Sequence, residues 1–262
     1  MSARSGFERD GHFVRDVVAA PGAATTLPIE SGQRQNVADL KRYNLISDFT
    51  ILLILYIILA KGDDCVDAQA RLEKLSEENG GILKTSMATD AGISRTTLST
   101  FLRRNGYERV FPGIYCAPEA WVDDFFILQL RCPHAVFSHE TALYLHALTD
   151  REPFSLSVTM KTGYNPSHLT RDGVKVYTLK GDLLEIGKTE LKTPFGHTVS
   201  AYDMERTVCD MLRSRSSVEA QALQDGLKQY VKRKDKNLHR LTDYARKFRV
   251  ERILTPYLEV LL

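Results

Sequence analysis

The sequence predicts an α+β fold, in which an N-terminal winged helix-turn-helix precedes an α+β domain with a helical C-terminal end. Three observations lead to this prediction. Residues 84–103 have the pattern of two short helices joined at a glycine, residues 107–117 have that of a hairpin, and strand patterns give way to helical patterns at residue 203. Strands followed by helices are typical of α+β domains. At 262 residues, with 43% hydrophobic residues, the chain is long enough for about two domains.

Residues 1–66 differ in composition from the rest of the chain, and we expect them to be a poorly structured tail. Residues 49–60, FTILLILYIILA, are apolar apart from one threonine, but fewer than the ~20 residues that a membrane-spanning helix needs. This stretch has three interpretations: an interfacial or short membrane anchor, a buried helix, or sequence upstream of the natural start. We favour dispensable sequence and a cytoplasmic protein, with membrane attachment as the less favoured alternative.

Residues 67–118 are the predicted DNA-binding domain. Gly92 lies where one short helix must end and the next begin, because a residue without Cβ can adopt positive φ there at little cost. Ser94 follows as the expected N-cap, with its hydroxyl accepting a backbone N–H two or three residues later. A preceding helix over residues 66–79 supplies Leu72 and Leu75 to the same core.

The second helix of this pair has an apolar face, formed by Leu98, Phe101 and Leu102. Its outward positions carry hydroxyl or basic side chains and no acid, which suits a groove lined with phosphates. Two further arginines flank the following hairpin, where they would contact backbone phosphates. The predicted DNA-contacting residues are therefore Ser94, Arg95, Thr96, Ser99, Thr100, Arg103, Arg104 and Arg109.

The hairpin decides between two interpretations of the helix pair. An isolated helix-Gly-helix pattern also fits an ordinary αα-hairpin with a solvated outer face. Residues 107–111 and 114–117, however, have the pattern of two short strands around Pro112-Gly113. A hairpin directly after a recognition helix is a wing, so we expect a winged helix-turn-helix with double-stranded DNA as its partner.

Residues 119–262 are the predicted second domain. We expect a connecting helix over residues 121–131, a strand over 135–137 and a helix over 139–148. Five further strands are expected at residues 154–160, 174–179, 183–186, 189–192 and 197–201. Asp203 is the expected N-cap of a helix, and three more helices are expected near residues 217–232, 236–247 and 250–261.

The distribution of charge is more informative than the net charge of +2. Residues 228–252 hold ten Lys or Arg against three acids. A solvated helical face is the ordinary explanation of such a run, and a second phosphate-contacting surface is the alternative. The residues of this predicted secondary basic surface are Lys228, Lys232, Arg233, Lys234 and Lys236.

We expect no metal, cofactor or small-molecule substrate. The four cysteines include no CxxC pair, which argues against a zinc ribbon or a thioredoxin-like motif. Cys132, His134 and His139 lie close together in the sequence, but they lack a fourth ligand at a characteristic spacing.

A nucleic-acid-processing enzyme is the alternative function, with Asp203, Glu205 and Asp210 as metal-binding carboxylates. No Gly-rich phosphate loop accompanies them. We expect structural roles instead: Asp203 as a helix cap, Glu205 in a first helical turn, and Asp210 paired with Arg206 at i,i+4. We therefore predict that the protein is not an enzyme.

Several segments resemble the AbiEi family of antitoxins. Residues 80–118, GGILKTSMATDAGISRTTLSTFLRRNGYERVFPGIYCAP, resemble the family's winged-helix domain. The segments FSHETALYLHALTDREPFSLSVTM, KTPFGHTVSAYDMERTVCDML and LKQYVKRKDKNL resemble its C-terminal domain. The resemblance covers about residues 68–262, so it says nothing about the first 66 residues.

The resemblance implies a function that composition and spacing do not supply. AbiEi antitoxins belong to two-gene toxin–antitoxin modules, many called type IV, that act in abortive infection, a phage defence. The resemblance implies that the protein represses its own promoter by binding inverted repeats. It also implies a functional partner, a nucleotidyltransferase-like toxin of the AbiEii family, and leaves open whether the two proteins touch.

Overall fold

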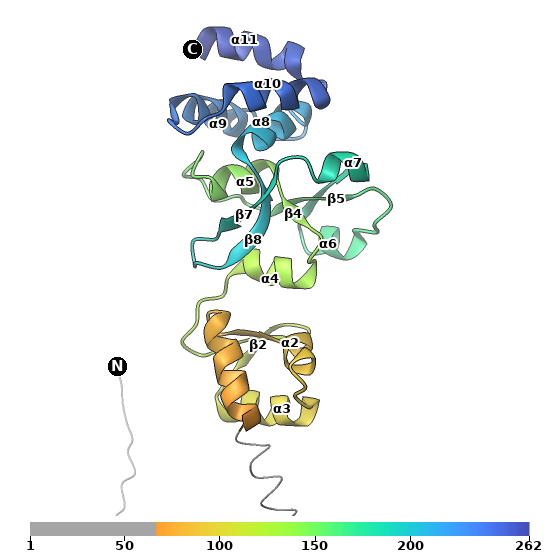
Figure 1. Ribbon diagram of the computed structural model, residues 1–262, viewed down its shortest axis with the longest axis vertical. Coiled ribbons are helices and arrows are strands. Elements are labelled where there is room, and N and C mark those ends of the chain that lie inside the picture. Colours follow the sequence, from red (N-terminus) through yellow and green to blue (C-terminus); the bar gives the residue numbers. More distant parts are fainter. Residues whose placement is uncertain (1–66, 262) are drawn as a thin grey trace, which may run out of the picture. The chain divides into compact units, whose positions relative to one another are not determined.

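The computed structural model describes residues 67–261, and the predicted tail with its apolar residues 49–60 lies outside them. The described chain contains two sheets and a series of helices, including a helical C-terminal end, which confirms the predicted α+β class (Figure 1). None of the helices in residues 67–261 is long and apolar enough to cross a membrane.

The N-terminal part begins with a helix over residues 67–78. The elements that follow are β1 (Ile82–Lys84), α2 (Thr85–Asp90), α3 (Arg95–Arg104), β2 (Glu108–Phe111) and β3 (Ile114–Cys116). The three strands form an antiparallel sheet in the order β1-β3-β2. The hairpin β2–β3 lies where the sequence predicts it, whereas β1 was not predicted.

Gly92 and Ser94 determine where α2 ends and α3 begins. Gly92 has a φ of +75°, which a glycine adopts without a Cβ clash. Ser94 caps α3, because its hydroxyl accepts the Thr97 N–H at 3.1 Å. The predicted apolar faces meet in one buried cluster, which contains Leu72, Leu83, Ala88, Ile93, Leu98, Phe101 and Leu102.

The second part is built on a five-stranded mixed sheet in the order β6-β5-β4-β8-β7. Its strands are β4 (Val136–Phe137), β5 (Ser157–Lys161), β6 (Lys175–Leu179), β7 (Lys188–Lys192) and β8 (Thr198–Tyr202). Its helices up to β8 are α4 (Asp124–Arg131), α5 (His139–Leu145), α6 (Ser167–Arg171) and α7 (Gly181–Leu184). The β5–β6 and β4–β8 pairs are parallel, and the β4–β5 and β7–β8 pairs are antiparallel.

Four helices form the C-terminal end: α8 (Met204–Arg213), α9 (Ala220–Lys232), α10 (Leu238–Lys247) and α11 (Glu251–Leu261). Val208, Met211 and Leu212 of α8 are buried, as the sequence predicts. They pack in one cluster with Leu227, Tyr230, Leu241 and Leu254 from the other three helices. The last three helices lie close to their predicted positions.

Two predicted elements were wrong in detail. Residues 183–186, predicted as a strand, form the end of α7 and the turn after it; their carbonyls at Leu183 and Ile186 accept the Arg206 guanidinium instead of a neighbouring strand. The connecting helix begins at Asp124 and not at Trp121, because Asp123 Oδ1 accepts the Phe126 N–H at 3.1 Å and caps it there. The short helix α6 was not predicted.

Candidate nucleic-acid interface

The predicted DNA-contacting side chains are all exposed. Arg95, Ser99 and Arg103 follow one another at intervals of four along α3, so they lie on one side of the helix. Thr96 and Thr100 occupy the adjacent stripe. The eight exposed residues are Ser94, Arg95, Thr96, Ser99, Thr100, Arg103, Arg104 and Arg109.

A groove of about 460 Å³ runs along this side of α3. Arg95, Ser99 and Arg103 line it from the helix, and Thr85 and Tyr115 line it from α2 and β3. The groove thus combines guanidinium and hydroxyl donors, the groups that contact phosphates and base edges. Thr85 and Tyr115 were not among the predicted contacts.

The signal that would have identified Tyr115 is its place in the hairpin register. Arg109 and Tyr115 are opposite one another across β2 and β3. The turn between these strands, Pro112-Gly113, packs back on α2: the Gly113 carbonyl accepts the Thr85 N–H at 2.8 Å and its hydroxyl at 3.2 Å. These bonds hold the hairpin beside α2 and set the position of Arg109.

The arginines of this surface have no competing carboxylate. Among the described residues, no ion pair involves Arg95, Arg103, Arg104 or Arg109. The first turn of α3 also carries no acid. Four unpaired guanidinium groups are therefore available to a polyanion, from which each phosphate contact releases counterions.

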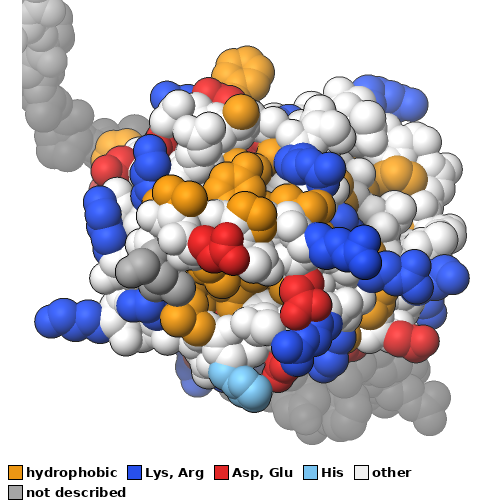
Figure 2. Space-filling model, turned by 90° about the horizontal axis from the view of Figure 1, so that it is seen from above, with side chains coloured by type: hydrophobic (Ala, Val, Ile, Leu, Met, Phe, Trp, Pro, Cys, Tyr) orange, Lys and Arg blue, Asp and Glu red, His pale blue; other side chains and the backbone are white. Residues whose placement is uncertain are grey.

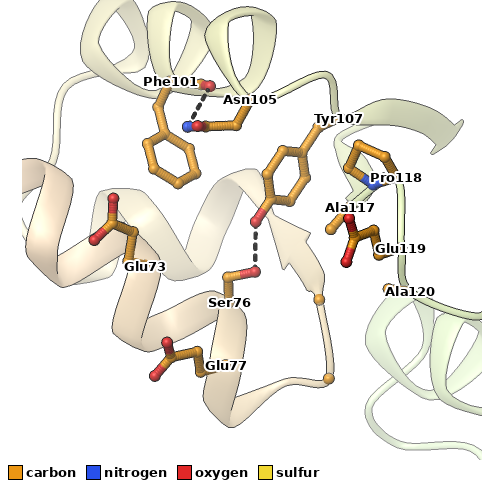
Figure 3. A pocket seen from close by; sticks show the side chains of 12 residues that line it. Glu73, Ser76, Glu77, Phe101, Asn105, Tyr107, Ala117, Pro118, Glu119 and Ala120 are labelled. Carbon is orange, nitrogen blue, oxygen red and sulfur yellow. Dashed lines mark hydrogen bonds between the residues drawn. The ribbon is translucent and has the colours of Figure 1, made fainter.

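Acidic side chains from other elements lie on the opposite side of α3. A pocket of about 540 Å³ lies between α3 and the helix over residues 67–78 (Figure 3). Its rim carries Glu73, Glu77 and Glu119, and a hydrogen bond of 2.5 Å between Ser76 and Tyr107 spans its floor. These carboxylates repel phosphates, so the electrostatics favour nucleic acid on the Arg95 side and disfavour it on this one.

The residues of the predicted secondary basic surface differ in exposure and in their hydrogen-bond partners. Lys228, Lys232 and Lys234 are exposed, but Arg233 makes two hydrogen bonds to Asp235, at 2.8 and 2.7 Å. Hydrogen bonding to Arg233 lowers the pKa of Asp235, as expected of an ion pair. Lys236 donates to the Arg233 carbonyl at 3.1 Å.

The three carboxylates of the alternative enzyme are held by hydrogen bonds and ion pairs within the protein. Asp203 accepts the Arg206 N–H at 2.8 Å, which confirms the predicted cap. Asp210 accepts Arg206 Nε at 3.0 Å, which confirms the predicted ion pair. Glu205 is buried and accepts from the Tyr230 hydroxyl and the Asn237 N–H. Burial raises the pKa of Asp203 and of Asp210.

The structure also separates the cysteine and histidines considered as metal ligands. Both ring nitrogens of His139 are engaged, with Ser138 at 2.9 Å and Ser214 at 3.0 Å. Cys132 Sγ instead lies 3.5 Å from Nε2 of His168. In the described part of the chain, no group of three or more His, Cys, Asp or Glu is placed to hold a metal ion.

Comparison with known proteins agrees with the resemblance. Residues 70–118 match the model of the family described as "Transcriptional regulator, AbiEi antitoxin". No curated protein matches the chain. The solved structure titled "Crystal structure of RV2827C protein from Mycobacterium tuberculosis" is similar at 17% identity, covering 69% of this chain and 71% of that chain with a TM-score of 0.46.

Proposed function

We propose that the protein is the antitoxin and transcriptional autorepressor of a bacterial toxin–antitoxin operon. Residues 67–118 act as a winged helix-turn-helix that binds inverted repeats in the operon's own promoter. The observation that carries this proposal is the α3 surface, where hydroxyls and arginines that form no ion pair within residues 67–261 face outward, while the other side of the domain is acidic. The family match over residues 70–118 supports the same function.

In the proposed complex, α3 enters the major groove. Thr96, Ser99 and Thr100 face base edges, and Arg95 and Arg103 contact bases or adjacent phosphates. Arg104 and Arg109 lie to either side and contact the flanking backbone. Phosphate contacts position the domain, whereas contacts to base edges select the sequence.

The second domain, residues 119–262, carries the antitoxin activity in this proposal. Its functional partner is a nucleotidyltransferase-like toxin of the AbiEii type, as the resemblance implies. Lys232 and Lys234, which are exposed, add phosphate contacts outside the operator core. Arg233 contributes less, because Asp235 already neutralises it.

Gel shifts with the promoter fragment upstream of its own gene test the DNA-binding part. We expect Arg95→Ala and Arg103→Ala each to weaken binding by about tenfold, since a lost base contact costs about 1–3 kcal/mol. Arg215→Ala is the matched control, because Arg215 is an exposed arginine of the second domain. Unchanged affinity in both α3 variants would show that this surface does not bind DNA.

Two further experiments test the alternative enzyme and the antitoxin activity. A repressor shifts the promoter fragment in EDTA, whereas an enzyme that depends on Asp203, Glu205 and Asp210 loses activity when the metal is removed.

Antitoxicity is tested in cells that express the neighbouring toxin gene. We expect Arg95→Ala to retain protection, because the substituted side chain lies outside residues 119–262.

A further inference from the structure

A basic pocket, here called the hairpin–α6 pocket, lies between the hairpin β2–β3 and the short helix α6 of the second domain. It encloses about 450 Å³. Phe111, Pro112 and Ile114 line it from the hairpin, and side chains from α4 and α6 complete the lining. The charged and titratable side chains in the lining are Lys84, Arg131, His168, Arg171 and Asp172.

Two cations of this pocket keep their charge. The Arg131 guanidinium pairs with the Asp172 carboxylate, so these two charges cancel. Within residues 67–261, no ion pair involves Lys84 or Arg171. Lys84 Nζ donates to the Leu130 carbonyl at 2.5 Å, which orients the ammonium group without neutralising it. The pocket therefore attracts an anion through Lys84 and Arg171.

Arg131 gives the pocket a fixed shape. Its guanidinium lies over the ring of Phe111, 3.6 Å from the ring centroid, while it pairs with Asp172 at the end of α6. This side chain is only 13% exposed. One residue thus joins the hairpin to α6, so that Arg171 is held beside the hairpin before any ligand binds. Such preorganisation lowers the entropic cost of binding.

The helical end of the second domain has a different distribution of charge. Figure 2 looks down on this end and shows acidic side chains interspersed with the basic ones. Arg233 and Arg246 of this end pair with Asp235 and Glu251. The hairpin–α6 pocket is lined by one carboxylate, and Arg131 already pairs with it.

The pocket lies on the other face of the hairpin from the groove along α3. Successive residues of a strand point to opposite faces of the sheet. Tyr115 of β3 accordingly lines the groove along α3, whereas Ile114 lines the hairpin–α6 pocket. Thr85 and Lys84 divide between the groove and the pocket in the same way. The hairpin therefore separates two surfaces that both carry unpaired cations.

The order of grooves and backbones on duplex DNA fits this arrangement. Beside the major groove lies one sugar–phosphate backbone, then the minor groove, which is about 6 Å wide, and then the second backbone. If α3 lies in the major groove, a hairpin beside it reaches the adjacent minor groove. The other face of that hairpin is then turned toward the second backbone.

We propose that the hairpin–α6 pocket is a phosphate site for duplex DNA, in which Arg171 and Lys84 hold a backbone phosphate across the minor groove from α3. The proposal rests on the proposed function, because it takes α3 to lie in the major groove. It gives the second domain a direct contact with DNA, at a different place from Lys232 and Lys234. A phosphate contact reads no sequence, but it fixes the orientation of the protein on the duplex.

Gel shifts of the 262-residue chain with the promoter fragment at several salt concentrations test this contact. We expect Arg171→Ala to weaken binding by about fivefold, the upper end for an exposed charge pair. The slope of log K against log salt should fall by about 0.9, the contribution of one phosphate. The affinity loss should be equal on the promoter fragment and on a scrambled duplex, because a phosphate contact carries no sequence information.

Two variants serve as controls. Arg171→Lys keeps the positive charge and should recover most of the affinity. Arg215→Ala removes an exposed arginine elsewhere in the second domain and should change neither the affinity nor the salt slope. Melting temperatures close to that of the parent chain show that the variants fold.

Duplexes that carry a single uncharged methylphosphonate locate the phosphate. We expect one position at which this modification weakens binding of the parent chain by about fivefold but leaves Arg171→Ala unaffected, because the variant already lacks the contact. An Arg171→Ala variant that binds as the parent does, or that loses as much as the parent at every modified position, would overturn the proposal.

The result is separable from that of the proposed function. If Arg95→Ala and Arg103→Ala weaken promoter binding while Arg171→Ala binds as the parent does, only the phosphate site fails. If the two α3 variants bind as the parent does while Arg171→Ala is weakened, the pocket binds DNA and the assignment of α3 to the major groove fails.

Discussion

Nδ1 of His197 lies 2.6 Å from Oδ2 of Asp123, a fully buried carboxylate that also caps α4. The other ring nitrogen, Nε2, lies 3.1 Å from the Asn79 carbonyl, which follows the helix over residues 67–78. The ring also stacks on Phe126, with 4.3 Å between the ring centroids. One side chain thus joins the turn before β8 to the start of α4 and to the N-terminal part.

We expect His197→Ala to weaken this junction. The substitution leaves Asp123 buried with one partner fewer, and such a loss costs about 1–3 kcal/mol of unfolding free energy. Limited proteolysis should also cut residues 117–122 faster, because the Asn79 contact is gone. Phe195→Ala, in the same turn and 47% exposed, is the control and should change neither quantity. Equal cleavage rates in the two variants would contradict the role given to His197.

Gly187 determines the position of Arg206. A Cβ added at Gly187, where φ is +74°, would lie 2.7 Å from Cβ of Arg206. The Arg206 guanidinium is buried, and it donates to the Leu183 and Ile186 carbonyls as well as to Asp210. We expect Gly187→Ala to destabilise the fold by more than about 2 kcal/mol, because strain and displacement of Arg206 add.

Gly173→Ala is the matched control for this prediction. Gly173 has a φ of +82°, but an added Cβ meets nothing within 4 Å, so only the backbone strain remains. That strain costs about 1–2 kcal/mol. Urea unfolding of both variants gives the comparison, and equal losses of stability would mean that Arg206 moves aside freely.

Local signals account for the elements that the sequence predicts. Ser94 and Asp203 cap their helices with side chains three residues from the N–H they accept, so a short stretch of sequence contains both partners. Pro112-Gly113 closes a two-residue turn in the same way. These features depend on neighbours along the chain, and spacing alone identifies them.

Other features depend on residues that are distant in the sequence. The tripeptide β1 is a strand only because β3 pairs with it, and a three-residue run has no period to detect. Residues 183–186 are too few for their apolar content to distinguish a strand from a helix. Their carbonyls at Leu183 and Ile186 accept hydrogen bonds from the guanidinium of Arg206, which is distant in the sequence. His197 was not singled out because its partners, Asp123 and Asn79, are 74 and 118 residues away.

The turn glycine between α2 and α3 gives a prediction about the DNA-binding surface. An added Cβ at Gly92 meets nothing within 4 Å beyond its two chain neighbours, so we expect a substitution there to act through its φ of +75°. We expect Gly92→Val to cost about 1–3 kcal/mol, and Gly92→Asn less, because asparagine tolerates this region. Thermal melting of both variants measures the difference. Equal melting temperatures would show that α3 can start without this turn.

Buried His139 makes stability depend on pH. Burial, with smaller contributions from Arg213 and Arg206, lowers the pKa of His139 to about 3. An unfolded histidine titrates near 6.5, so between pH 6.5 and 3 the unfolded chain binds a proton that the folded chain does not. The contribution of His139 to stability is therefore fully present above pH 6.5 and is lost as the pH falls, by about 1.4 kcal/mol per pH unit. Raised pKa values of Asp203 and Asp210 act in the opposite direction, so a variant is needed to isolate the histidine.

His139→Gln removes this titration while keeping a side chain that can hydrogen-bond to Ser138 or Ser214. We expect the variant to be less stable than the parent at pH 7, because it loses the stacking of the imidazole on Tyr177, whose ring centroid lies 3.5 Å away. The deficit should shrink steadily below pH 6.5, because only the parent chain then loses stability through this residue. Urea unfolding at several pH values between 7.5 and 4.5 measures it, with His134→Gln, at an exposed histidine, as the control that should run parallel to the parent. If the His139 variant also runs parallel to the parent, then His139 binds its proton equally in both states and does not set the acid limit of the fold.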